Sequence, residues 1–457
     1  MFVSTLRFSI LVFVLQNSGV SNAQVTTPLA SPVSSQSSLT APPTSSPSGR
    51  IYISVGDPKV KKVLLAIEPT EGGGEVGRQF NSTLISDLSF TDYFEFLPPG
   101  KMPTTAGDMK AYKSLGVEFL ISSKMASSGG KHQGELRLFD VARGEQILGR
   151  VYPLVGSAPQ PGREIAHYAG NDVIGVLTGE PGIFRSRILM SCGNKRKEIY
   201  IMDFDGQNFR PLTQDGYFAL SPSWAPDGYR ILFTSYKAAV RGGFVNPNLY
   251  MLDTRNNSRK PLSAAKGLNT GGAFHPIENK VAYTYSQNGK PEIYLLDLDK
   301  NIRTPVTRTL FFSVEPSWSP DGNRLSFSSS KTGKPHIWVA NSDGSNAKRL
   351  TFAGEYNSSP DWSPRGDKIV FSGQENMGNN FNIFMIDPSG SNLVRLTDDV
   401  TSNENPSFSP DGRLLAFSSN REGSYRIYIM TALGTQIRAL TPKNVGHCKQ
   451  PSWSPRL

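Results

Sequence analysis

The 457-residue sequence predicts an α/β N-terminal domain followed by an all-β six-bladed propeller. Residues 50–178 alternate short apolar strands with two helix-like segments. Residues 179–457 repeat an aromatic residue every 44 to 50 positions, and four of its six copies follow Pro-Ser. The 43 glycines and 33 prolines fit the many tight turns of a propeller. With 2 cysteines, the chain is neither a disulfide-dense scaffold nor a multi-cysteine zinc module.

Residues 1–23 have the pattern of a secretory signal peptide. Arg7 precedes the apolar run Phe8–Leu15, and Ser21–Ala23 offers small residues for cleavage before Gln24. The run is far shorter than the ~20 apolar residues of a spanning helix. We therefore expect an exported protein without a membrane span and without a nucleic-acid partner.

Residues 24–49 are rich in Ser, Thr and Pro and carry no charge, which predicts a disordered linker. Residues 50–178 contain equal numbers of basic and acidic side chains, so most of the net charge of +10 lies in residues 179–457. A basic propeller on an exported chain suggests an acidic protein partner or an envelope surface.

The domain at 50–178 is predicted from its periodicity. The stripe Val76, Phe80, Leu84 and Leu88 indicates a helix over Glu75–Phe90. A second helix is expected from about Arg163 to Leu177, and the expected strands are Ile51–Val55, Val63–Ile67, Tyr93–Leu97, Val117–Met125, Glu135–Val141 and Gln146–Tyr152. The stretch Glu71–Gly74 lacks GxGxxG and Gly-Lys-Ser/Thr, which favours a strand-to-helix turn over a phosphate loop.

The propeller is predicted from the repeat. Its aromatic anchors are Trp224, Phe274, Trp318, Trp362, Phe408 and Trp453. Each unit reads as four strands A to D, with a Pro-Asp-Gly-type turn between A and B in most units. The first unit lacks a strand A and the last Trp segment lacks a strand B, so the C-terminal segment is expected to close the first blade. Asp203-x-Asp205-Gly206 lacks the later ligands of a calcium loop and is interpreted as a turn.

The turn also predicts a register. If a three-residue Pro-Asp-Gly loop makes Ser319 face Asn323, then Ser313 faces Ser329 in the same blade.

The two cysteines occupy these same two positions in the closing blade. Cys192 matches the position of Ser329 and Cys448 that of Ser313, which predicts a disulfide that fastens the ring. Two free thiols remain the alternative, because a shift of one residue would place them on opposite faces.

The order of parts resembles the TolB family over about 400 residues. The resemblance rests on signal peptide, α/β domain and six blades in sequence, with the motifs Leu115–Val117, His167–Gly170, Leu177–Gly179, Gly182–Ile188 and Pro451–Leu457. It implies a monomeric, non-enzymatic scaffold of the periplasmic Tol–Pal system, without cofactor, that supports outer-membrane integrity and constriction at division. It also implies that the propeller binds the lipoprotein Pal, that an N-terminal strand binds TolA, and that other envelope proteins are further partners.

The segment resembling the TolA-binding strand lies about 26 residues inside the predicted mature start. It consists of Ile51, Tyr52, Ile53, Ser54 and Val55. An extended segment of this kind can add to the sheet edge of a partner, while an ordinary edge strand is the alternative.

The propeller face with the B–C and D–A connections is the expected partner site, because variable loops on a rigid scaffold commonly carry recognition. The aromatic and amide residues expected to be exposed there are Tyr217, Phe218, Phe312, Tyr356, Asn357 and Asn403. The candidate residues are Lys195, Arg196, Lys197, Tyr217, Phe218, Asn269, Thr270, Phe312, Glu315, Tyr356, Asn357, Asn403 and Glu404.

No catalytic, cofactor or metal residue is predicted. The sequence contains no Gly-x-Ser-x-Gly elbow, and its histidines form no metal spacing. His167 is expected to be packed or solvated. A periplasmic glycan-binding or lyase-type β-propeller remains the alternative, on fold analogy alone.

Overall fold

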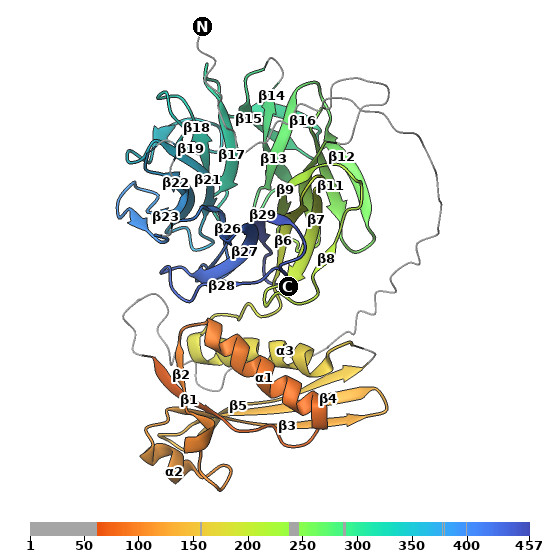
Figure 1. Ribbon diagram of the computed structural model, residues 1–457, viewed down its shortest axis with the longest axis vertical. Helices are drawn as coiled ribbons and strands as arrows, with labels where there is room; N and C mark the ends of the chain where they lie inside the picture. Colours follow the sequence, from red (N-terminus) through yellow and green to blue (C-terminus); the bar gives the residue numbers. More distant parts are fainter. Residues whose placement is uncertain are drawn as a thin grey trace. The chain divides into compact units, whose positions relative to one another are not determined.

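The computed structural model describes residues 62–155, 158–236, 246–286, 289–376, 378, 380–398 and 400–457. The predicted signal peptide, the linker and the strand at 51–55 lie outside these residues. The described part forms one five-stranded sheet with helices, followed by six four-stranded sheets (Figure 1).

The α/β domain is built around a mixed sheet. Its elements in chain order are β1 (Val63–Ile67), α1 (Gly74–Phe90), β2 (Phe94–Phe96), η1 (Pro99–Lys101), α2 (Met109–Ser114), β3 (Phe119–Ser128), β4 (Lys131–Asp140), β5 (Glu145–Val155) and α3 (Pro161–Thr178). The sheet order is β2-β1-β3-β4-β5, in which β1 is parallel to β2 and β3, and β3, β4 and β5 are joined as antiparallel neighbours.

The helices lie on both faces of this sheet. α1 and α3 pack on one face, and α2 lies on the other (Figure 1). Phe80, Leu84 and Leu88 of the predicted stripe are fully buried on α1. Sequence periodicity did not predict α2, because a helix of six residues has no repeating stripe. Asp108 caps α2 by accepting hydrogen bonds from the backbone N–H groups of Lys110 and Ala111.

The propeller has the six predicted blades. The strands of each blade are given from A to D. Blade 1 consists of β29 (His447–Trp453), β6 (Arg187–Gly193), β7 (Glu198–Asp203) and β8 (Arg210–Pro211), and blade 2 of β9 (Ala219–Trp224), β10 (Arg230–Ser235), β11 (Asn248–Asp253) and β12 (Ser258–Ser263). Blade 3 consists of β13 (Leu268–Phe274), β14 (Lys280–Ser286), β15 (Glu292–Asp297) and β16 (Ile302–Pro305), and blade 4 of β17 (Ser313–Trp318), β18 (Arg324–Ser329), β19 (His336–Asn341) and β20 (Lys348–Arg349). Blade 5 consists of β21 (Tyr356–Trp362), β22 (Ile369–Gln374), β23 (Asn382–Ile386) and β24 (Val394–Arg395), and blade 6 of β25 (Asn403–Phe408), β26 (Leu414–Glu422), β27 (Ser424–Thr431) and β28 (Arg438–Ala439). The C-terminal strand β29 supplies strand A of the first blade, as predicted.

The A–B turn differs from the predicted one by one residue. The Ser319 N–H donates to the carbonyl of Arg324, so Ser319 faces Arg324 and the predicted pairing with Asn323 is wrong. The loop between the paired residues therefore contains four residues, because the glycine bulge is followed by one more unpaired position.

A bulge in strand A restores the register beyond the turn. Glu315 has a left-handed backbone with φ of 58°, and the register shifts between Val314 and Ser317. Ser313 consequently pairs with Ser329, the pairing expected from the sequence. The two one-residue errors, at the turn and at the bulge, cancel.

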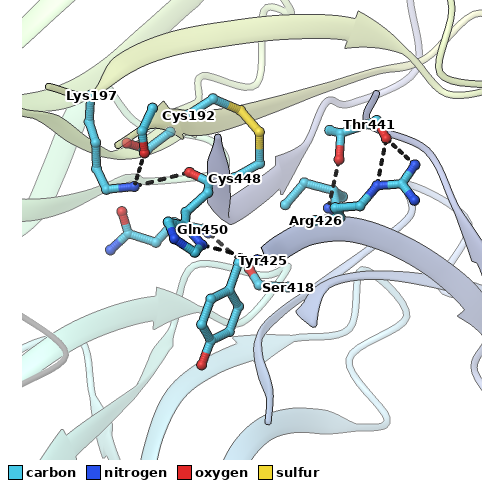
Figure 2. The surroundings of a disulfide bond; sticks show 12 residues. Cys192, Lys197, Ser418, Tyr425, Arg426, Thr441, Cys448 and Gln450 are labelled. Carbon is cyan, nitrogen blue, oxygen red and sulfur yellow. Dashed lines mark hydrogen bonds between the residues drawn. A yellow bond between two sulfur atoms is a disulfide. The ribbon is translucent and has the colours of Figure 1, made fainter. Parts of the chain in front are cut away.

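The closing blade has the corresponding register and contains the two cysteines. Cys448 on β29 lies directly opposite Cys192 on β6, and a disulfide joins them (Figure 2). At the other end of β29 the indole N–H of Trp453 donates to the Ser186 hydroxyl at 2.8 Å. The first and last strands of the propeller are thus linked along the length of the blade.

The predicted turn at Asp203–Gly206 holds a guanidinium group. Arg163 of α3 donates to both carboxylate oxygens of Asp205 at 2.8 Å and to Asp203 at 2.7 Å. Burial alone would raise the pKa of Asp205, but the hydrogen bonds and charge of Arg163 outweigh it and lower that pKa. The two carboxylates therefore form an ion cluster with Arg163 that joins helix α3 to blade 1.

His167 is packed, as expected. Its ring is buried, and its Nδ1 lies 2.7 Å from a carboxylate oxygen of Asp87 on α1. Burial raises the pKa of Asp87 to about 6, although the neighbouring His167 opposes the shift.

Candidate partner-binding site

The two faces of the propeller differ in their connections. A–B and C–D turns lie at one face, and B–C and D–A connections lie at the other. Helix α3 and the turn after α1 make polar contacts with C–D turns of the blades. Arg163 of α3 binds Asp203 and Asp205, and Gln436 donates to Asp92 of the turn after α1. The opposite face is the one that the sequence predicts to bind a partner.

We call this opposite side the loop face. Its described residues are the B–C positions 194–197, 236, 246–247, 289–291, 330–335, 375–376, 378, 380–381 and 423, and the D–A positions 212–218, 264–267, 306–312, 350–355, 396–398, 400–402 and 440–446.

The predicted site residues divide into three groups by exposure. The exposed ones are Lys195, Arg196 and Tyr217. The half-buried ones are Lys197, Phe218, Phe312, Glu315 and Tyr356. The buried ones are Asn269, Thr270, Asn357, Asn403 and Glu404. The expectation that Asn357 and Asn403 are exposed is therefore wrong.

The buried asparagines hold the D–A connections. The Asn357 amide donates to the Ala353 carbonyl and to His336 Nδ1, both at 3.0 Å. Asn269 donates in the same way to the carbonyls of Ala265 and Gly267, at 2.7 and 3.0 Å. Both residues stand at or near the start of a strand A, where the side chain turns into the blade and satisfies loop carbonyls.

Glu404 and Thr270 are also engaged inside the propeller. The Glu404 carboxylate accepts hydrogen bonds from the Tyr425 hydroxyl and, at 3.0 Å, from Lys449 Nζ. Thr270 Oγ1 lies 2.8 Å from Thr234 Oγ1 of the neighbouring blade. These two side chains are buried and bind other residues of the propeller.

Lys197 fastens the closing blade from the loop face. Its Nζ donates to the carbonyls of Gly193 at 3.2 Å and His447 at 3.0 Å, beside the disulfide (Figure 2). Burial, with a contribution from the charge of Lys449, lowers the pKa of Lys197 to about 8. Of the predicted basic loop, Lys195 and Arg196 are the members whose side chains are exposed.

A ring of left-handed residues follows the inner strands around the propeller. Its members have φ between 51° and 59° and are Ser221, Gly271, Glu315, Ser359, Asn405 and Gln450. Neighbouring members bind one another: the Ser221 N–H donates to Gln450 Oε1 at 2.9 Å, and the Ser359 N–H donates to Glu315 Oε2 at 2.7 Å. Burial raises the pKa of Glu315, although the Ser359 bonds oppose the shift. Five of the six members directly precede the proline of the repeat motif, a signal that the sequence already contains.

Large apolar side chains on the D–A connections were not predicted from the sequence. Phe352 and Val400 are 74% and 92% exposed, and Leu310 and Phe311 are 78% and 44% exposed. With Tyr217, they place exposed apolar or aromatic surface on four D–A connections of the loop face. The opposite face exposes fewer large apolar side chains, namely Ile277, Leu393 and Leu433. Clustered apolar surface is typical of faces that bind protein partners.

Basic side chains accompany these apolar residues on the loop face. The exposed ones on B–C connections are Lys195, Arg196, Lys290, Lys331 and Lys334. A surface with apolar and basic side chains can bind an acidic partner protein whose contact surface has an apolar centre. In the described part of the chain, no group of three or more His, Cys, Asp or Glu side chains could hold a metal ion. None of its helices is long and apolar enough to cross a bilayer.

Comparison with known proteins assigns the family of both domains. The profile of the TolB beta propeller domain matches residues 175–457, and that of the TolB amino-terminal domain matches residues 51–147. The Tol-Pal system protein TolB of Desulfosudis oleivorans is 36% identical over 254 residues, covering 52% of this chain and 56% of that protein. The Protein TolB homolog of Chlorobium chlorochromatii is 36% identical over 280 residues, covering 51% and 63%. The matched region is thus about half to two thirds of the length of these relatives.

A solved structure has the same fold. The crystal structure of TolB from Acinetobacter baumannii superposes with a TM-score of 0.74 at 24% identity, covering 87% of this chain and 97% of that one. The propeller profile alone covers more than half of the chain. The chain therefore belongs to the TolB family.

Proposed function

We propose that this protein is a non-enzymatic periplasmic scaffold of the Tol–Pal system. It binds the lipoprotein Pal through the loop face of the propeller and TolA through the N-terminal segment 51–55. In this role it supports outer-membrane integrity and constriction during cell division.

The observation that carries the proposal is the composition of the loop face. Exposed apolar side chains on four D–A connections stand beside exposed lysine and arginine side chains on B–C connections. The polar contacts of α3 and of the turn after α1 are made to turns of the other face, so a partner can dock on the loop face without displacing them.

The assignment of TolA to segment 51–55 rests on the family resemblance. The segment Ile51–Val55 alternates apolar and polar residues, which suits addition to the sheet edge of a partner. It precedes the first strand of the α/β domain, so the TolA and Pal sites belong to different parts of the chain.

Calorimetry with purified Pal and with the C-terminal domain of TolA tests the two sites separately. Deletion of residues 51–55 should abolish TolA binding and leave Pal binding unchanged. The double variant Lys195→Glu/Arg196→Glu should weaken Pal binding and reduce its salt dependence, because rim charges steer association. Lys300→Glu, an exposed charge on a C–D turn, is the matched control. Unchanged Pal affinity in the double variant, or Pal binding lost in the control, would contradict the assignment of the loop face.

A further inference from the structure

A cleft of about 760 Å³ opens in the α/β domain, away from the propeller blades. Its floor is formed by β3 and β4, and its walls by the connection from β1 to α1 and by the segment 99–107 that contains η1. None of the residues predicted from the sequence as a partner site lines this cleft.

The cleft lies where the topology of the sheet leaves a crevice. β1 continues through α1 to β2 on one side, whereas its other neighbour β3 is reached through α2 on the opposite face (Figure 1). The connections that leave the carboxyl ends of the neighbouring strands β1 and β2 therefore lead to opposite faces of the sheet, and in open α/β sheets ligands bind at such switch points. Glu68, the residue directly after β1, lines the cleft at this position.

Glu68 is a buried carboxylate with one engaged oxygen. Glu68 is 8% exposed. Its Oε1 accepts hydrogen bonds from the Gly107 N–H at 2.6 Å and from the Tyr112 hydroxyl at 3.0 Å. Burial, with a contribution from Glu68, raises the pKa of Tyr112, so this hydroxyl remains a neutral donor. No described residue donates a hydrogen bond to Oε2 or forms an ion pair with Glu68.

The other charges of the cleft are already paired. Lys124 Nζ lies 2.8 Å from Glu71 and the Arg137 guanidinium 2.6 Å from Glu135, and all four side chains are at least 30% exposed at the rim. Glu68 is therefore the one carboxylate of the cleft that lacks a counter-charge among the described residues. Its second oxygen, Oε2, is open to the cleft, where an incoming cation would meet a carboxylate that no described cation neutralises.

We propose that this cleft binds a lysine side chain presented by an extended peptide segment of a partner protein, with the ammonium group on Glu68 Oε2. A single free oxygen suits the point charge of lysine, since the fork of arginine needs both carboxylate oxygens and Oε1 is occupied. Met102, Pro99 and Pro103 on the wall provide apolar surface for the aliphatic stem. The volume exceeds that of one side chain, which leaves room for the flanking backbone.

Titration of the full-length protein with two capped tripeptides tests this site. The probes are N-acetyl-Ala-Lys-Ala-amide and its neutral counterpart N-acetyl-Ala-Met-Ala-amide, followed by the NMR shift of the Gly107 amide. The lysine peptide should shift this signal in a saturable manner and bind about tenfold or more tightly than the methionine peptide. Glu68→Gln, which keeps an oxygen acceptor for Gly107 and Tyr112, should abolish this preference. Glu75→Gln, an exposed carboxylate on α1, should leave the preference unchanged.

A second variant separates binding from folding. Ser122→Leu fills the floor of the cleft and leaves the hydrogen bonds of Glu68 in place, so it should prevent binding by both peptides. Absence of any saturable shift in the unmodified protein, equal affinity for both peptides, or an undiminished lysine preference in Glu68→Gln would overturn the proposal. Butylamine as a third probe should bind more weakly than the lysine peptide, and equal binding would contradict a peptide ligand.

Discussion

At the scale of single residues, asparagines at or near the starts of inner strands determine the shape of the loop face. Replacing Asn357 by Ala leaves the Ala353 carbonyl and His336 Nδ1 without their donor. The free energy of unfolding should fall by about 1–3 kcal/mol, the usual cost of an unsatisfied buried group. Urea unfolding of Asn357→Ala measures this loss against the exposed control Asn376→Ala, for which no loss is expected. Equal stability of the two variants would contradict the structural role.

The lowered pKa of Lys197 predicts that the free energy of unfolding depends on pH. Its pKa is lowered to about 8 in the folded protein, so between about pH 8 and 10 the unfolded state binds more protons than the folded state. The free energy of unfolding should therefore rise with pH in this window relative to Lys197→Met. Below about pH 7 the difference between the two proteins should be constant. A difference that stays flat from pH 7 to 10 in urea titrations would show that Lys197 titrates normally.

From the sequence, polar residues near the loop face could be located, but whether their side chains are exposed could not be predicted. Asn357 and Asn403 follow turns, which suggests exposure, but at strand starts their side chains point into the blade. Which way such a residue points depends on the pairing of the whole strand, and this cannot be read from its neighbours alone. Phe352 and Val400 lie between strands D and A and could have been recognised as exposed apolar loop residues.

At the scale of elements, the closing blade joins the two ends of the propeller. The repeat predicted that β29 pairs with β6 and that the cysteines face each other. The predicted turn was one residue too short, and the left-handed bulge before the proline was not foreseen. Each error alone would have moved the cysteines out of register. Such bulges require positive φ at Glu315 or Gln450, which the propensity of these residue types does not indicate; the signal lies instead in their position before the proline of the repeat.

The disulfide of this blade should contribute strongly to stability. It joins residues 256 positions apart, and the chain-entropy description gives about 5 kcal/mol for such a loop, with measured values of about 2–5 kcal/mol. Cys192→Ser/Cys448→Ser should be less stable by an amount in this range, as measured by urea unfolding under non-reducing conditions. Ser313 and Ser329 occupy the equivalent positions in blade 4, so the serine pair fits the site. Non-reducing mass spectrometry that finds two free thiols in the purified protein would contradict the bridge.

At the scale of the whole molecule, the two faces of the propeller have different roles. One face carries the turns that bind Arg163 and Asp92 of the α/β domain. The other face carries most of the exposed large apolar side chains of the connections, beside exposed lysine and arginine side chains. The division of the chain and the number of blades were predictable, because repeats and periodicity encode them directly. The cleft at Glu68 was not, because it depends on α2 and on the divergence of connections around β1.

The proposed binding of Pal to the loop face can be tested with two residues of nearly equal exposure on opposite faces of the propeller. Phe352 on a D–A connection is 74% exposed, and Ile277 in an A–B turn is 75% exposed. Calorimetric titration of Pal should give an affinity about tenfold or more weaker for Phe352→Ser, because burial of an aromatic side chain is worth about 1.5–3 kcal/mol. Ile277→Ser should bind Pal like the unmodified protein. Unchanged affinity in Phe352→Ser together with weakened binding in Ile277→Ser would place the partner on the opposite face and contradict this account.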